Sequence, residues 1–184
     1  MEREATVDCP LDCEYLVEAR RHEKVEYPDP EQAPNRDIRV SEKMLEDNEK
    51  LLAFLSQAVV EAATETPGAV DFDVREALES LVRTYRSLES GVYYETVPAN
   101  PLAAHVHRQV QGQLEEFRRA ERQHSGVTTT RDADVLGCLV FLQRLGLNNN
   151  NGRRRGRAFL SVLVEFYGGP PPSGPAAGSS LILP

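Results

Sequence analysis

Apolar residues recur along residues 74–92 at alternating spacings of four and three, and this repeat most constrains how the chain folds. Residues three and four apart share one face of an α-helix, so the repeat predicts a helix packed by one apolar seam against another helix. Asp73 is expected as its N-cap, with Glu76 completing a capping box, and Gly91 as its stop. The seam consists of Val74, Leu78, Leu81, Tyr85, Leu88 and Val92.

A second and wider apolar stripe lies in residues 41–66. Ser41 is a suitable N-cap for a helix there, and Pro67 followed by Gly68 stops it. Because the stripe is wide, we expect this helix to lie at the centre of the core. The stripe consists of Met44, Leu45, Leu51, Leu52, Phe54, Leu55, Ala58, Val59 and Ala62.

The middle of the chain predicts an extended link followed by another helix. Residues 92–98 are rich in Val, Tyr and Thr, which favour extended backbone. Asn100 then has the character of an N-cap and Pro101 that of a first helical residue, so a helix is predicted from there to about Gln123.

Two more helices are predicted before the chain loses its periodicity. Thr129 or Thr130 is expected to cap the first of them. Residues 148–152, four asparagines and a glycine, predict a loop, since both residue types tolerate left-handed backbone. The last helix should end near Tyr167.

Together these patterns predict an all-α fold, a single bundle-like domain of five to six helices over residues 1–167. Within it we expect a short helix at about 10–23, a Pro-rich linker at about 27–37 and the main bundle at about 41–167. Short connections predict that consecutive helices pack as antiparallel neighbours. Residues 168–184 are rich in Pro and Gly and predict a flexible tail.

Cysteine number and hydropathy predict a soluble cytoplasmic protein. The chain has three cysteines, an odd number, which is typical of reduced thiols and not of a disulfide framework. No apolar run is long enough to cross a membrane, and Met1-Glu2-Arg3-Glu4 opens no signal peptide.

Charge is divided unevenly along the sequence. Residues 1–90 hold 11 Lys and Arg against 22 Asp and Glu, whereas residues 91–184 hold 10 against 7. The acidic first half disfavours a general nucleic-acid-binding surface, because phosphates would be repelled there.

The cysteine pair is the first candidate site. Cys9 and Cys13 are four residues apart at the start of a predicted helix, so both thiols share one face and can hold one metal ion. His22 is the nearest further ligand for zinc, and a partner chain or another part of this one would have to complete the four. Packing of both thiols in the core and redox chemistry are the alternatives. The third cysteine, Cys138, lies among apolar residues and is expected to pack as one of them.

The arginine cluster is the second candidate site. Arg153, Arg154, Arg155 and Arg157 gather near the start of the last predicted helix, where the helix dipole repels cations. A bound phosphate, a nucleic acid or an acidic surface from residues 1–90 would offset that repulsion. Solvated charge in an arginine-rich protein is the alternative.

No catalytic constellation is recognisable, since the chain lacks a nucleophile elbow and a P-loop and does not carry a Glu-x-x-His motif on each of two helices. We therefore predict a non-enzymatic protein-interaction or adaptor module with a protein partner and no membrane association. The alternatives are a small zinc-binding protein that uses Cys9 and Cys13, and binding of phosphate or nucleic acid through the arginine cluster.

Overall fold

The computed structural model describes residues 33–167 and shows six helices and no strand in that range, which confirms the all-α prediction. The predicted helix at 10–23, most of the Pro-rich linker and the predicted tail at 168–184 lie outside the described residues. The helices are α3 (Glu42–Asp47), α4 (Glu49–Glu65), α5 (Asp71–Glu89), α6 (Pro101–Ser125), α7 (Asp132–Asn148) and α8 (Ala158–Tyr167).

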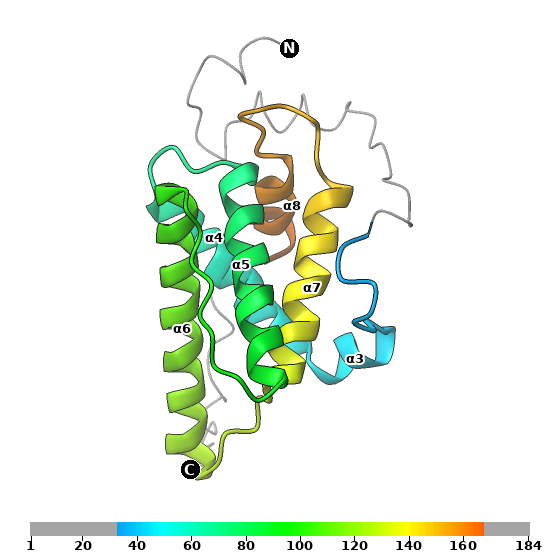
Figure 1. Ribbon diagram of the computed structural model, residues 1–184, viewed down its shortest axis with the longest axis vertical. Helices are drawn as coiled ribbons and strands as arrows, with labels where there is room; N and C mark the ends of the chain where they lie inside the picture. Colours follow the sequence, from blue (N-terminus) through cyan, green and yellow to red (C-terminus); the bar gives the residue numbers. More distant parts are fainter. Residues whose placement is uncertain (1–32, 168–184) are drawn as a thin grey trace, which may run out of the picture.

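The helices form two layers around one apolar core. In Figure 1, α6, α5 and α7 stand side by side with α5 in the middle, while α4 and α8 lie behind them. Helix α4 packs against α6, α8 and α7, so the wide apolar stripe does place it centrally, as predicted. The largest fully buried side chains are Phe159, Leu55, Leu78, Leu81, Leu114, Leu136, Leu139, Leu142, Leu160 and Leu163.

Helices α5 and α6 run parallel, so the prediction that consecutive helices are antiparallel neighbours is wrong for this pair. Asn100, the N-cap of α6, donates a hydrogen bond from its side-chain amide to Asp73 in the first turn of α5. Both helices therefore begin at the same end of the molecule, and the link between them returns along the whole length of α5 (Figure 1). A link of this length permits the parallel arrangement, whereas a tight turn would have forbidden it.

The predicted single helix over residues 41–66 is broken at Asn48 into α3 and α4. Ser41 caps α3 as expected and accepts a hydrogen bond from the Met44 N–H at 3.2 Å. Asn48 leaves helical geometry, with φ −118° and ψ 23°, and its side-chain amide donates to the Met44 carbonyl at 2.9 Å. That bond offers the backbone an alternative to continuing the helix, which is why asparagine favours helix ends.

The expected capping role of Asp73 is also wrong, because α5 begins two residues earlier. Val70 is the N-cap residue, and the Asp73 carboxylate accepts a hydrogen bond from the Val70 N–H at 2.9 Å. Asp73 thus acts from the third helical position, the place that Glu or Gln takes in a capping box.

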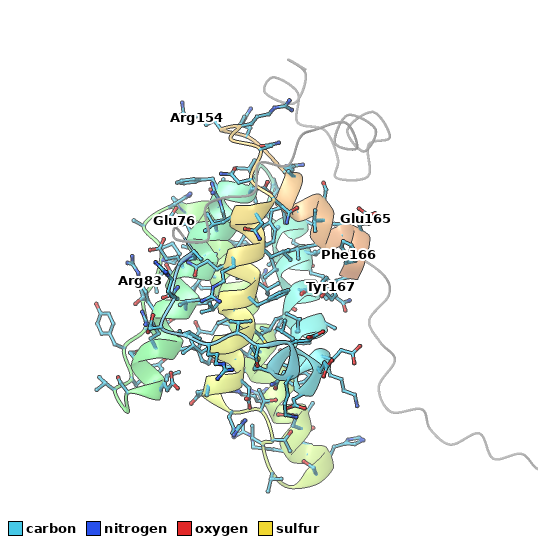
Figure 2. The ribbon with its side chains drawn as sticks, turned by 90° about the vertical axis from the view of Figure 1, so that its right-hand side faces the viewer. Glu76, Arg83, Arg154, Glu165, Phe166 and Tyr167 are labelled. Carbon is cyan, nitrogen blue, oxygen red and sulfur yellow. The ribbon has the colours of Figure 1, made fainter. Side chains whose placement is uncertain are left out.

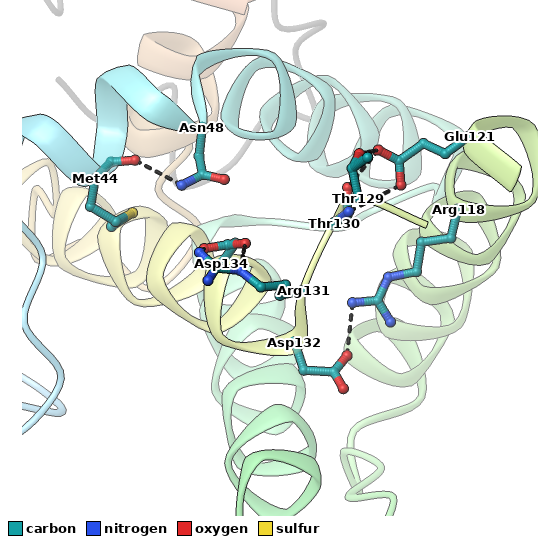
Figure 3. A network of polar contacts seen from close by, with 9 residues as sticks. All are labelled: Met44, Asn48, Arg118, Glu121, Thr129, Thr130, Arg131, Asp132 and Asp134. Atoms are coloured by element: carbon teal, nitrogen blue, oxygen red, sulfur yellow. Dashed lines mark hydrogen bonds and ion pairs between the residues drawn. The ribbon is translucent and has the colours of Figure 1, made fainter. Parts of the chain in front are cut away.

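The ends of α6 follow the sequence signals closely, whereas the start of α7 does not. Asn100 accepts a hydrogen bond from the Leu102 N–H at 3.0 Å, and Gly126 ends α6 with φ 75°. Arg131, not Thr129 or Thr130, is the N-cap residue of α7. Both threonine hydroxyls donate instead to the Glu121 carboxylate on α6 (Figure 3).

Candidate protein-binding site

Of the two candidate sites predicted from the sequence, only the arginine cluster lies within the described residues. Cys9, Cys13 and His22 lie outside residues 33–167, so the zinc site stays a prediction. Among the described residues, no group of three or more His, Cys, Asp or Glu is arranged to hold a metal ion. Cys138 is fully buried in α7, as expected, and burial raises the pKa of its thiol to about 12.

The arginine cluster lies in the turn that precedes α8. Arg154 and Arg155 are exposed, and Figure 2 shows Arg154 projecting from this end of the molecule, away from the helices. Arg153 and Arg157 are half-buried. The structure therefore brings the four together in one turn but leaves only two of them fully open to solvent.

The N-terminus of α8 is occupied by a carboxylate from α5. Asp71 is buried and accepts hydrogen bonds from the Phe159 and Leu160 N–H groups, both at 3.0 Å. Its own N–H donates to the Gly156 carbonyl at 2.9 Å. An anion at a helix N-terminus is stabilised by the free N–H groups and by the helix dipole. Because Asp71 already takes two of these N–H groups, an external phosphate would depend chiefly on the guanidinium groups.

Exposed apolar side chains concentrate in the link between α5 and α6. We call residues 92–97 the strap. Val92 is 60% exposed, Tyr93 67%, Tyr94 68% and Val97 52%. The other large apolar residues that are exposed among residues 33–167 are scattered: Phe72, Val127 and Phe166. The sequence predicted the extended conformation of this segment but not its exposure.

The length of the strap forces it to be extended. Tyr94 is hydrogen-bonded to Ser87, and Asn100 to Asp73, so the chain between them must run back along fourteen residues of α5. That distance is about 21 Å at 1.5 Å per helical residue. Six residue steps of extended chain span about 20–21 Å, so almost no slack remains.

One edge of the strap is tied to α5 by side-chain hydroxyl groups. The Tyr94 N–H donates to Ser87 Oγ at 3.2 Å, and Ser87 Oγ donates to the Tyr94 carbonyl at 2.9 Å. The Thr96 N–H donates to Thr84 Oγ1 at 2.9 Å. Ser87 and Thr84 therefore take the place that a neighbouring strand would have in a sheet.

The other edge of the strap has no hydrogen-bond partner among residues 33–167. In an extended chain, successive N–H groups point to opposite sides. The N–H groups of Tyr93, Glu95 and Val97 alternate with those of Val92, Tyr94 and Thr96, which bond to α5, and none of the first three has an acceptor within residues 33–167. Glu95 is exposed and forms no ion pair with any described residue. Among the described residues, the strap thus carries three N–H groups without an acceptor and one carboxylate without an ion pair.

The helices that carry the strap are fixed to one another near its lower end. Arg118 of α6 pairs with Asp132 of α7 at 2.7 Å (Figure 3). Its guanidinium carbon lies 5.7 Å from the centre of the Tyr85 ring on α5. Burial raises the pKa of Tyr85 to about 12, so its ring stays neutral beside Arg118. Three helices are linked through this one guanidinium.

The first turn of α7 is held by a second ion pair. Arg131 donates two hydrogen bonds of 2.8 Å to Asp134, and this arginine keeps the pKa of the Asp134 carboxyl below its usual value (Figure 3). The side chain of Asn48, at the α3–α4 break, makes a smaller contribution to lowering the same pKa. The start of α7 therefore lies close to the break between α3 and α4.

A buried histidine lies in α6. His107 is fully inaccessible to solvent, and neither ring nitrogen has a hydrogen-bond partner among the described residues. Burial lowers its pKa, while the carboxylate of Glu95 on the strap acts in the opposite direction. A neutral, unpartnered imidazole in the core is a destabilising feature, and it marks a place where the packing depends on pH.

The strap combines apolar side chains, free backbone groups and a carboxylate on a segment held at both ends. Exposed apolar clusters and unpaired extended edges are features of protein-binding segments. Residues 33–167 contain no helix that is both long enough and apolar enough to cross a membrane. No family model, curated protein sequence or solved structure matches the chain.

Proposed function

We propose that this chain is a non-enzymatic protein-interaction module and that the strap is its binding site for a segment of a partner protein. The observation that carries the proposal is the concentration of four exposed large apolar side chains in six consecutive residues. Single exposed apolar residues are ordinary on a protein surface, but a contiguous cluster of them marks an interaction site.

The energetics favour binding at a segment that is already ordered. Covering one Tyr or Val side chain contributes about 1.5–3 kcal/mol, so two or three such contacts support binding by a short peptide. Ordering a flexible loop on binding would consume much of that free energy. The strap is already extended and tied to Ser87 and Thr84, so little further ordering is needed.

The test uses a random peptide library displayed on phage and selected against the full chain. Enriched peptides are then measured for affinity by fluorescence anisotropy. In the strap variant, Tyr93, Tyr94 and Val97 are all replaced by Ser, and the expected loss of affinity is at least about tenfold because two or more apolar contacts disappear.

The matched control replaces the scattered exposed residues Phe72, Val127 and Phe166 by Ser, which removes similar apolar surface elsewhere. This control should bind the peptides as the parent chain does. Urea unfolding of both variants checks that the fold is intact. Equal binding by the strap variant, or loss of binding in the control alone, would contradict the proposal.

A further inference from the structure

We infer that the strap binds its partner by strand addition, in which an extended partner segment pairs with its free edge. The partner segment carries Lys or Arg opposite Glu95, with a β-branched residue two positions away on each side. This inference rests on the proposed function and names the partner's chemistry. The unpaired edge consists of the N–H and carbonyl groups of Tyr93, Glu95 and Val97, which alternate with groups bonded to α5. An extended peptide can pair with such an edge as a new strand would.

The side chains of Tyr93, Glu95 and Val97 determine which partner side chains would be complementary to them. Tyr93 and Val97 flank Glu95 at spacings of two, so all three side chains lie on one face of the strap. In a paired strand, directly opposite side chains make contact, and aromatic–β-branched and opposite-charge pairs are the favourable ones. The complementary pattern is therefore a basic residue with a β-branched residue two positions away on each side.

A second copy of this chain does not fit that pattern. The antiparallel register that pairs all three edge residues places Tyr93 opposite Val97 and Glu95 opposite the Glu95 of the other copy. Two carboxylates directly opposite each other are unfavourable. The net charge of −8 adds a general repulsion between copies.

The segments of this chain outside residues 33–167 do not fit either. Residues 168–184 contain no Lys or Arg, so they offer no cation for Glu95. In residues 1–32 the basic residues are Arg3, Arg20, Arg21 and Lys24, and none has a β-branched residue two positions away. Neither segment therefore carries the complementary pattern.

The experiment repeats the peptide selection on the parent chain and on Glu95→Lys in parallel. The parent should enrich peptides with Lys or Arg between β-branched residues, and Glu95→Lys should enrich Asp or Glu at the same place. For a synthetic pair, acetyl-Thr-Val-Thr-Lys-Thr-Val-Thr-amide and its Lys→Glu counterpart, the preference should differ by about fivefold and reverse in the variant.

Backbone methylation separates strand addition from simple apolar contact. N-methylation removes an N–H donor, so placing it on alternate residues of the peptide tests which edge is paired. N-methylation of the peptide residues whose N–H groups point toward the strap should weaken binding about tenfold. N-methylation of the intervening residues, whose N–H groups point away, should leave the affinity unchanged.

The outcomes distinguish this inference from the proposed function. One outcome is that peptides bind the parent chain but not the strap variant, and that their affinity changes neither with N-methylation nor with the charge of residue 95. This outcome would overturn strand addition while supporting the strap as the binding site. A chain that enriches no peptide overturns both. Self-association of the parent chain in sedimentation velocity, abolished in the strap variant, would identify a second copy as the occupant and overturn the inference.

Discussion

The buried carboxylate of Asp71 gives the sharpest prediction about stability. It stands at the first position of α5 and accepts hydrogen bonds from the Phe159 and Leu160 N–H groups at the start of α8. The Asp71→Ala variant removes both acceptors. The Asp71→Asn variant keeps one oxygen acceptor and removes the negative charge.

The expected magnitude follows from these two bonds. A hydrogen bond to a charged group contributes about 1.5–3 kcal/mol, and a buried N–H left without an acceptor costs about 1–3 kcal/mol. Phe159 and Leu160 are both buried, so water does not readily replace the lost acceptor. We expect Asp71→Ala to lower the free energy of unfolding by about 3–5 kcal/mol and Asp71→Asn by about half as much.

Urea unfolding monitored by circular dichroism measures these differences. The matched control is Asp47→Ala, which also removes one negative charge but breaks only an exposed pair with Lys43. That control should change the free energy of unfolding by no more than about 0.5 kcal/mol. If Asp71→Ala costs no more than Asp47→Ala, the carboxylate does not anchor α8 and this account of the α7–α8 turn is wrong.

Three other predictions concern titratable and metal-binding groups. Burial lowers the pKa of His107 below 6.5, so the unfolded chain binds a proton more readily than the folded chain does. The free energy of unfolding should therefore fall as the pH drops through 6.5, by at most about 1.4 kcal/mol per pH unit. Urea unfolding at several pH values should show this slope in the parent chain and a smaller slope in His107→Leu. Iodoacetamide at pH 8 should leave Cys138 unmodified in the folded chain and modify it in urea, as read by mass spectrometry. Protein purified without a polyhistidine tag should contain zinc that the Cys9→Ser/Cys13→Ser variant lacks, and equal metal content in both would remove that hypothesis.

Local signals in the sequence predicted the helices well, and the errors arose where one residue supports two local structures. Asn100 and Ser41 act as predicted, because a cap needs only its own neighbouring backbone. The capping position of Asp73 was predicted wrongly and the break at Asn48 was not predicted, since a short polar side chain can bond to the backbone on either side of it. The apolar periodicity continued through Asn48 and gave no sign of the break there.

The candidate site depended on contacts that no local pattern reveals. The extended link was predicted from its Val, Tyr and Thr content, but its anchoring by Thr84 and Ser87 depends on which way α6 runs. The partner of the α8 N-terminus, Asp71, lies 88 residues away from Phe159 in the sequence. Such pairings follow from the three-dimensional arrangement of the helices, which apolar stripes alone leave open.

Amide hydrogen exchange measured by NMR tests the unpaired edge of the strap most directly. In the free full-length chain, the N–H groups of Tyr94 and Thr96 should exchange several-fold more slowly than those of Tyr93, Glu95 and Val97, because only the first two are hydrogen-bonded. Adding a bound peptide should slow the second set as well. Uniform exchange along residues 92–97 in the free chain, or a peptide that leaves the second set unchanged, would contradict the account.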